Sequence, residues 1–136
     1  MIKKLTLIIL IYLAAPFAIA ESAREYFKFA KFNFDSENYI KALEFINRAI
    51  DADPQYVSGL LLRARINFSL NEFHGVIDDV TTAFDLDKNA NNSMADFYLL
   101  RGDAYFKLNE LNNAKKDIDY CIKLNPRNAA AYFCLL

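Results

Sequence analysis

The stretch NYIKAL at residues 38–43 returns 34 residues later as EFHGVI at residues 72–77, with the same order of large, small and aliphatic positions. A third copy follows after four extra residues, 91–94, and carries ELNNA at residues 110–114. A period of this length is typical of repeat architectures, in which one unit cannot bury its apolar face alone and neighbouring copies must stack. The sequence therefore predicts three stacked copies.

Each copy is predicted to contain two helices. The chain has only three Gly and three Pro in 136 residues, which favours long uninterrupted helices. Small residues recur where two helices must approach closely, namely Ala30, Ala64 and Gly102, then Ala42, Val76 and Ala114, then Ala49, Ala83 and Cys121. The predicted fold class is all-α, an α-solenoid of stacked antiparallel helix pairs, over a domain at 21–136. Its repeats are 23–56, 57–90 and 95–128, with a partial repeat or capping helix at 129–136.

Local signals mark the expected helix starts. Ser22 with Glu25 forms a capping box, and so does Ser93 with Asp96. The pairs Asp53-Pro54 and Asn125-Pro126 place an N-cap residue before a proline at the first helical position.

The first twenty residues are expected to be a cleaved signal peptide. Lys3 and Lys4 precede an apolar run at residues 5–13, and residues 18–20 form an A-x-A cleavage pattern. A membrane anchor is the alternative, but the run is shorter than the roughly 20 residues of a spanning helix. We therefore expect an exported chain, periplasmic or secreted, that begins at Glu21 and has no membrane segment.

The mature chain resembles the tetratricopeptide repeat family. YLLRGDAY at residues 98–105, followed by Ala114, Ile118, Cys121 and Pro126, matches the family pattern of a large residue, a small residue and an aromatic, then further small residues and a closing proline. The first two copies have Asn33 and Asn67 where the aromatic is usual, and the second has Lys88 for the closing proline.

The resemblance implies a protein or peptide ligand along the first helix of each copy. The family's ligand-facing positions are here Phe27, Lys31 and Phe34, then Leu61, Arg65 and Phe68, then Leu99, Asp103 and Phe106. They would form an apolar ladder, and packing of these aromatic rings within the repeats is the alternative. The family's clamp for a C-terminal carboxylate is absent, because its basic and amide positions hold Phe27 and Lys31, Leu62, and Asp96 and Leu100.

A paired exchange between copies predicts structural ion pairs. Arg63 and Asp79 lie sixteen residues apart in the second copy, and Arg101 and Asp117 occupy the same positions in the third. In the first copy both positions are apolar, Phe29 and Phe45. A buried unpaired charge is costly, whereas a charge pair or an apolar pair can each fill such a site. We therefore expect two ion pairs and one aromatic contact.

The sequence offers little catalytic chemistry. His74 is a lone helical histidine without converging ligands, so no metal site is predicted. Cys121 and Cys134 are an even pair in an exported chain, which leaves two readings, a disulfide or a buried thiol at the small position of Cys121. No nucleophile–base arrangement and no phosphate loop is visible, so we expect neither enzymatic activity nor a cofactor.

The expected function is a protein-interaction scaffold whose partner is an unidentified protein or peptide. Removal of the two leader lysines leaves 14 basic against 17 acidic residues, which argues against nucleic-acid binding. Residues 129–136 are apolar all round, and Tyr132, Phe133, Leu135 and Leu136 are expected to drive self-association into a homo-oligomer. The alternatives are a structural assembly component that associates through this segment, or a non-catalytic helical subunit of a cell-envelope complex.

Overall fold

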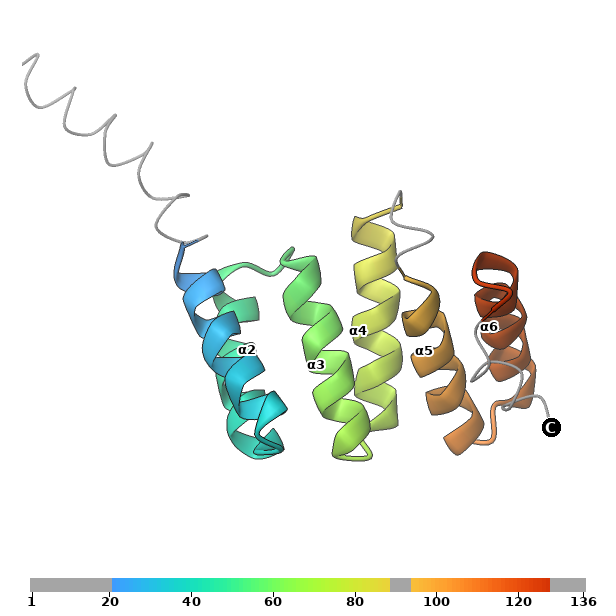
Figure 1. The fold of residues 1–136 in the computed structure, drawn as a ribbon, viewed down its shortest axis with the longest axis horizontal. Coiled ribbons are helices and arrows are strands. Elements are labelled where there is room, and N and C mark those ends of the chain that lie inside the picture. The colour runs from blue at the N-terminus through green and yellow to red at the C-terminus, as the bar shows by residue number, and fades with distance from the viewer. Residues whose placement is uncertain (1–20, 89–93, 128–136) are drawn as a thin grey trace, which may run out of the picture. The chain divides into compact units, whose positions relative to one another are not determined.

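The computed structural model describes residues 21–88 and 94–127, and all regular structure in these ranges is helical. A first helix covers residues 21–35. It is followed by α2 (Tyr39–Ala52), α3 (Val57–Ser69), α4 (Phe73–Leu86), α5 (Ala95–Lys107) and α6 (Leu111–Leu124), as Figure 1 shows. Within each copy the two helices are joined by a short turn, at residues 36–38, 70–72 and 108–110, as in antiparallel helix pairs. The predicted all-α class, with the helix pairs of an α-solenoid, is therefore confirmed.

The chain divides into two compact units between Tyr56 and Val57. The first unit holds the helix at residues 21–35 and α2. The second holds α3 to α6, in which α3 packs on α4, α4 on α5 and α5 on α6. Each unit thus contains whole helix pairs, one copy in the first unit and two in the second.

The small residues of the repeat lie where the helices meet. Gly102 in α5 is buried, and a Cβ atom added there would stand 3.1 Å from Cγ1 of Ile118 in α6. Such a close approach explains why this position holds Ala30, Ala64 or Gly102 in the three copies. The other small positions are buried as well, namely Ala42, Val76 and Ala114, and Ala49, Ala83 and Cys121.

The turn inside each copy has the same geometry in all three. Glu37, Asn71 and Asn109 adopt positive φ angles of 58°, 63° and 62°. The next residue donates its backbone N–H to the carbonyl oxygen five residues earlier, and the N···O distance is 2.8 Å in each copy. The bonds run from Asn38 to Asn33, from Glu72 to Asn67 and from Glu110 to Tyr105. These bonds define the Schellman motif, which closes a helix with one residue in the left-handed region.

The predicted helix starts at Asp53-Pro54 and Asn125-Pro126 are wrong. Asp53 is the C-cap of α2, and α3 begins only at Val57. The carboxylate of Asp53 accepts a hydrogen bond from the backbone N–H of Gln55 at 3.1 Å, so it stabilises a turn instead of a helix start. Asn125 caps the end of α6 and accepts from the N–H of Arg127 at 3.2 Å in the same way.

Glu21 and Ser22 are already helical, so Ser22 is not the residue that precedes the helix at residues 21–35. Ser93, of the second expected box, lies outside the described residues. The start of α2 is instead capped by Asn38, whose side chain accepts from the backbone N–H of Lys41.

Candidate protein-binding surface and intra-repeat pairs

The second copy contains the expected Arg–Asp pair. Arg63 of α3 donates from Nε to one carboxylate oxygen of Asp79 at 2.9 Å and from Nη2 to the other at 2.6 Å. This two-bond geometry fixes the relative orientation of α3 and α4, since the planar guanidinium matches the carboxylate. Asp79 is buried and Arg63 only partly so.

The third copy repeats the pair and extends it to its neighbour. Arg101 of α5 donates to both carboxylate oxygens of Asp117 in α6, at 2.7 and 2.9 Å. Its Nη1 donates to the hydroxyl of Thr81 in α4 at 2.8 Å, and its guanidinium lies over the ring of Phe84 at 5.1 Å. Burial of Arg101 opposes the charged form, but the hydrogen bond and charge of Asp117 outweigh it, and the pKa of Arg101 is raised. Arg101 therefore stays charged, and its side chain links two copies.

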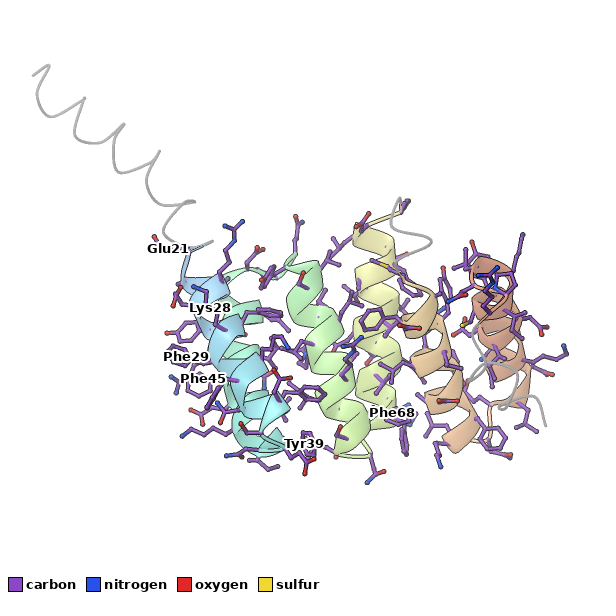
Figure 2. All side chains as sticks on the ribbon, viewed as in Figure 1. Glu21, Lys28, Phe29, Tyr39, Phe45 and Phe68 are labelled. Carbon is purple, nitrogen blue, oxygen red and sulfur yellow. The ribbon has the colours of Figure 1, made fainter. Side chains whose placement is uncertain are left out.

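The first copy has the expected aromatic contact instead. The rings of Phe29 and Phe45 are stacked, with centroids 5.4 Å apart and an angle of 30° between their planes (Figure 2). Phe29 is nevertheless 53% exposed. The equivalent pair of positions thus holds two aromatic residues in the first copy and an ion pair in the other two. At these positions, only the first copy leaves a large apolar side chain in contact with solvent.

One buried polar contact was not foreseen in the sequence. Asn67 stands where the family usually has an aromatic, and its amide donates to Asp79 at 3.3 Å. A Cβ atom added to Gly75 would lie 2.7 Å from this amide nitrogen. Gly75 therefore makes room for Asn67. The other copies have Lys41 and Asn113 at the position of Gly75, so the glycine in the same copy as Asn67 was the signal that could have revealed the contact.

The ligand-facing aromatic residues pack largely within their own copies. Phe27 meets Tyr56 at 5.4 Å, Phe34 meets Tyr39 at 5.7 Å, and Phe68 meets Phe73 at 5.6 Å between ring centroids. These contacts fit the packing alternative for three of the four phenylalanines expected in the ladder. Phe106 of α5 is different, because it is 56% exposed.

The remaining ligand-facing positions are mostly accessible. Lys31 is exposed and pairs with Asp35 at 2.9 Å. Arg65 of α3 is exposed, and its guanidinium lies 4.9 Å from the ring centroid of Phe97 in α5. Leu61 and Asp103 are half-buried, and Leu99 packs on the buried pair formed by Ala95 and Cys121. Within the second unit α3 and α5 are in contact, so their accessible residues form one surface, whereas those of residues 21–35 belong to the other unit.

Four of the five positions of the family's carboxylate clamp hold residues that are unsuited to bind an anion, and the fifth, Lys31, pairs with Asp35. Leu62 is buried, and Leu100 packs against the core cluster of Ala64, Val76, Val80 and Ala104. Asp96 is exposed and carries the same charge as the carboxylate it would have to bind. Neither an aliphatic nor an acidic side chain can replace a basic clamp residue.

The other candidate residues are either accessible, buried or outside the described part of the chain. His74 is exposed, and the described residues contain no cluster of three or more His, Cys, Asp or Glu that could hold a metal ion. Cys121 is buried, whereas Cys134 lies outside the described residues, as do Tyr132, Phe133, Leu135 and Leu136. None of the helices in the described part of the chain is long and apolar enough to cross a bilayer.

Stacked helix pairs with a small residue at each crossing and a Schellman turn in each copy define a helical repeat protein. The family model of the Tetratricopeptide repeat matches residues 21–56 and 95–128, more than half of the chain. The chain belongs to the tetratricopeptide repeat family. The copy between these ranges, 57–90, is the one with Lys88 in place of the closing proline.

Two curated relatives are similar to this chain over most of its length. DnaJ protein P58IPK homolog B of Oryza sativa subsp. japonica is 31% identical over 106 residues, which are 75% of this chain and 22% of the relative. RNA polymerase II-associated protein 3 of Homo sapiens is 32% identical over 113 residues, 83% of this chain and 15% of the relative. The chain therefore spans less than a quarter of the length of these relatives.

Solved structures show the same fold. The first TPR of Spaghetti (RPAP3), bound to the HSP90 peptide SRMEEVD, has a TM-score of 0.77 and 28% identity over 85% of this chain and 89% of that one. The second TPR domain of human RPAP3, in complex with the HSP70 peptide SGPTIEEVD, has a TM-score of 0.71 and 27% identity. The match covers 87% of this chain and 92% of that one. The Arabidopsis OM64 TPR domain has a TM-score of 0.77 and 23% identity over 86% of this chain and 93% of that one. At this identity it supports the fold alone.

Proposed function

We propose that this chain is a protein-interaction module that holds a peptide or protein segment along the first helices of its repeats. The observation that carries the proposal is the accessible surface of α3 and α5. There the exposed guanidinium of Arg65 is held over the Phe97 ring at 4.9 Å, and Phe106 is exposed on α5. Aromatic residues and arginine are the side chains enriched at protein interfaces.

The ligand is held by its internal side chains and not by a terminal carboxylate. Two similar domains bind acidic peptides, SRMEEVD and SGPTIEEVD, which supports peptide binding as the function of this chain too. Leu62 and Leu100, however, are part of the packed interior at the clamp positions. An acidic side chain of the ligand would instead meet Arg65, and an apolar one would meet Phe106.

Charge would orient the ligand. Within the second unit, the first-helix surface is basic at Arg65 of the second copy and acidic at Asp96 and Asp103 of the third. A segment with an acidic end and a basic end therefore binds in one direction, because the reverse direction places like charges together. The module acts as an adaptor and has no catalytic step of its own in this proposal.

The proposed place of action is outside the cytoplasm, periplasmic or secreted. The support is the leader pattern of residues 1–20, two lysines, an apolar run and an A-x-A site. N-terminal sequencing of the protein made from its full reading frame tests the idea. A mature chain that begins at Glu21 supports export, whereas an intact leader on cytoplasmic protein contradicts it.

Site-directed photocrosslinking tests the binding surface. A benzoylphenylalanine at Phe106 on α5 should crosslink the partner in the native compartment, and the same group at exposed Tyr120 on α6 should not. Arg65→Glu should abolish the crosslink from position 106. Its matched control is Arg48→Glu, since Arg48 is also exposed and lies 5.8 Å from the Phe45 ring. Equal crosslinking from positions 106 and 120, or from both charge variants, would show that the first helices are not the binding surface.

A further inference from the structure

The first copy exposes an apolar face that has no equivalent in the other copies. Phe29, Phe32 and Phe45 line a cavity of about 620 Å³, together with Lys28 and Lys41. This volume lies in the range of roughly 300–1,000 Å³ that is common for binding pockets. Phe32 is 69% exposed and Phe29 53%, so the face is open to solvent. We call Phe29, Phe32 and Phe45 the first-copy face.

The third copy shows what covers this position inside a stack of repeats. Arg101 is the equivalent of Phe29, and it contacts Thr81 and Phe84, both on the second helix of the preceding copy. In a repeat array, therefore, this side of a copy receives the end of the unit that comes before it. A partner for the first-copy face should be a segment that behaves like the end of such an array and that presents large apolar side chains.

This chain carries such a segment in its own sequence. Residues 129–136, AAAYFCLL, contain four large apolar side chains and no charge. Tyr132 lies 34 residues after Tyr98, whose ring packs at 4.2 Å on Phe84 of the preceding copy. The segment therefore resembles the start of a further first helix. Its Tyr132 falls at the position that packs on the copy before it, so Phe133, Leu135 and Leu136 are the large apolar residues left to meet a second copy.

We propose that the first-copy face binds residues 129–136 of a second copy of this chain, so that copies associate head to tail. Such an interface is heterologous, because two different surfaces meet and each copy keeps one of each free. Association should therefore continue beyond the dimer as concentration rises. Since residues 129–136 carry no charged side chain, added salt should weaken the association little.

The test is a complementation experiment in analytical ultracentrifugation, with a reductant present so that thiols do not crosslink. The protein is expressed from its full reading frame and purified from the compartment where it accumulates. The face variant is Phe32→Lys, because Phe32 is highly exposed and its replacement leaves the Phe29–Phe45 stacking in place. The tail variant is Tyr132→Lys with Leu136→Lys. The control is Leu86→Lys, an exposed leucine at the end of α4.

The wild type and Leu86→Lys should form species larger than dimers, and each test variant alone should remain monomeric. An equimolar mixture of the two test variants should form heterodimers and nothing larger, because one intact face and one intact tail remain. Should Phe32→Lys fail to fold, Phe32→Ser replaces it and should raise the dissociation constant roughly tenfold or more. A monomeric wild type at high concentration overturns the proposal, and so does a mixture that stays monomeric. Dimers of the tail variant alone would show face-to-face pairing and overturn it as well.

Discussion

Three turns in the described ranges, 21–88 and 94–127, place a residue other than glycine in the left-handed region. Asn71 and Asn109 suit this conformation, because asparagine tolerates it better than most residues do. Glu37 has the same geometry, with φ at 58°, but its longer side chain gives no such compensation. The backbone hydrogen bonds of the Schellman motif impose the conformation on whichever residue is present, so the strain differs from copy to copy.

Glu37→Gly should therefore stabilise the first unit by about 1 kcal/mol, since glycine adopts positive φ without steric cost. Asn109→Gly is the matched control and should gain clearly less. Urea unfolding, monitored by the hydrogen exchange of backbone amides in α2, measures the change in the free energy of unfolding of the first unit. A loss of stability in Glu37→Gly would show that the glutamate side chain stabilises the turn by more than the strain of its positive φ angle costs.

At the scale of helices, a contact recurs at the same position between the two helices of every copy. Arg63–Asp79 links α3 to α4, and Arg101–Asp117 links α5 to α6. The exchange of both residues together for phenylalanines in the first copy was sufficient to predict these contacts from the sequence. The bond from Arg101 to Thr81 could not be predicted in this way, because it depends on how closely α4 and α5 approach.

Arg101→Met should destabilise the second unit by about 3 kcal/mol, because it leaves the buried carboxylate of Asp117 without its cation. The double variant Arg101→Met with Asp117→Leu should cost clearly less, about 1 kcal/mol, because no charge remains buried. Urea denaturation of both variants measures the difference. Equal costs would mean that the pair contributes nothing beyond the packing of its side chains.

A solvent-exposed pair provides the comparison for this experiment. Lys115 and Asp119 of α6 are 2.7 Å apart, and both side chains are more than half exposed. Lys115→Met should change stability by less than about 1 kcal/mol, because exposed ion pairs contribute little. A large loss here would indicate that α6 is unusually sensitive to any substitution.

For the whole molecule, the 34-residue period and the positions of the small residues were enough to predict the fold class and the helix pairs. Proline positions were less informative, because the side chains of Asp53 and Asn125 bind turn N–H groups after a helix instead of capping the next one. The accessibility of the ligand-facing phenylalanines also could not be predicted from their spacing in the sequence. Whether Phe34 or Phe68 is accessible depends on a second ring, Tyr39 or Phe73, that reaches it across the turn.

Stability should decrease at alkaline pH. Burial raises the pKa values of Tyr56, Tyr98 and Tyr105, with smaller effects of nearby charges. The folded state therefore disfavours the ionised phenol, and the stabilisation present below about pH 10 is lost as pH rises through the raised values. Tyr98→Phe should reduce this loss in urea titrations between about pH 8 and about pH 11. The same variant at about pH 7 is the control, and an unchanged alkaline decrease would contradict the assignment to Tyr98.

The two ways of filling the intra-repeat position also give the copies different responses to temperature. The stacked phenylalanines of the first copy rely on the removal of apolar surface from water, a driving force that weakens on cooling. The arginine–aspartate pairs of the other copies carry a dehydration penalty that becomes smaller on heating. We therefore expect cooling to weaken the Phe29–Phe45 contact more than the two arginine–aspartate pairs, and heating to favour the ionic pairs.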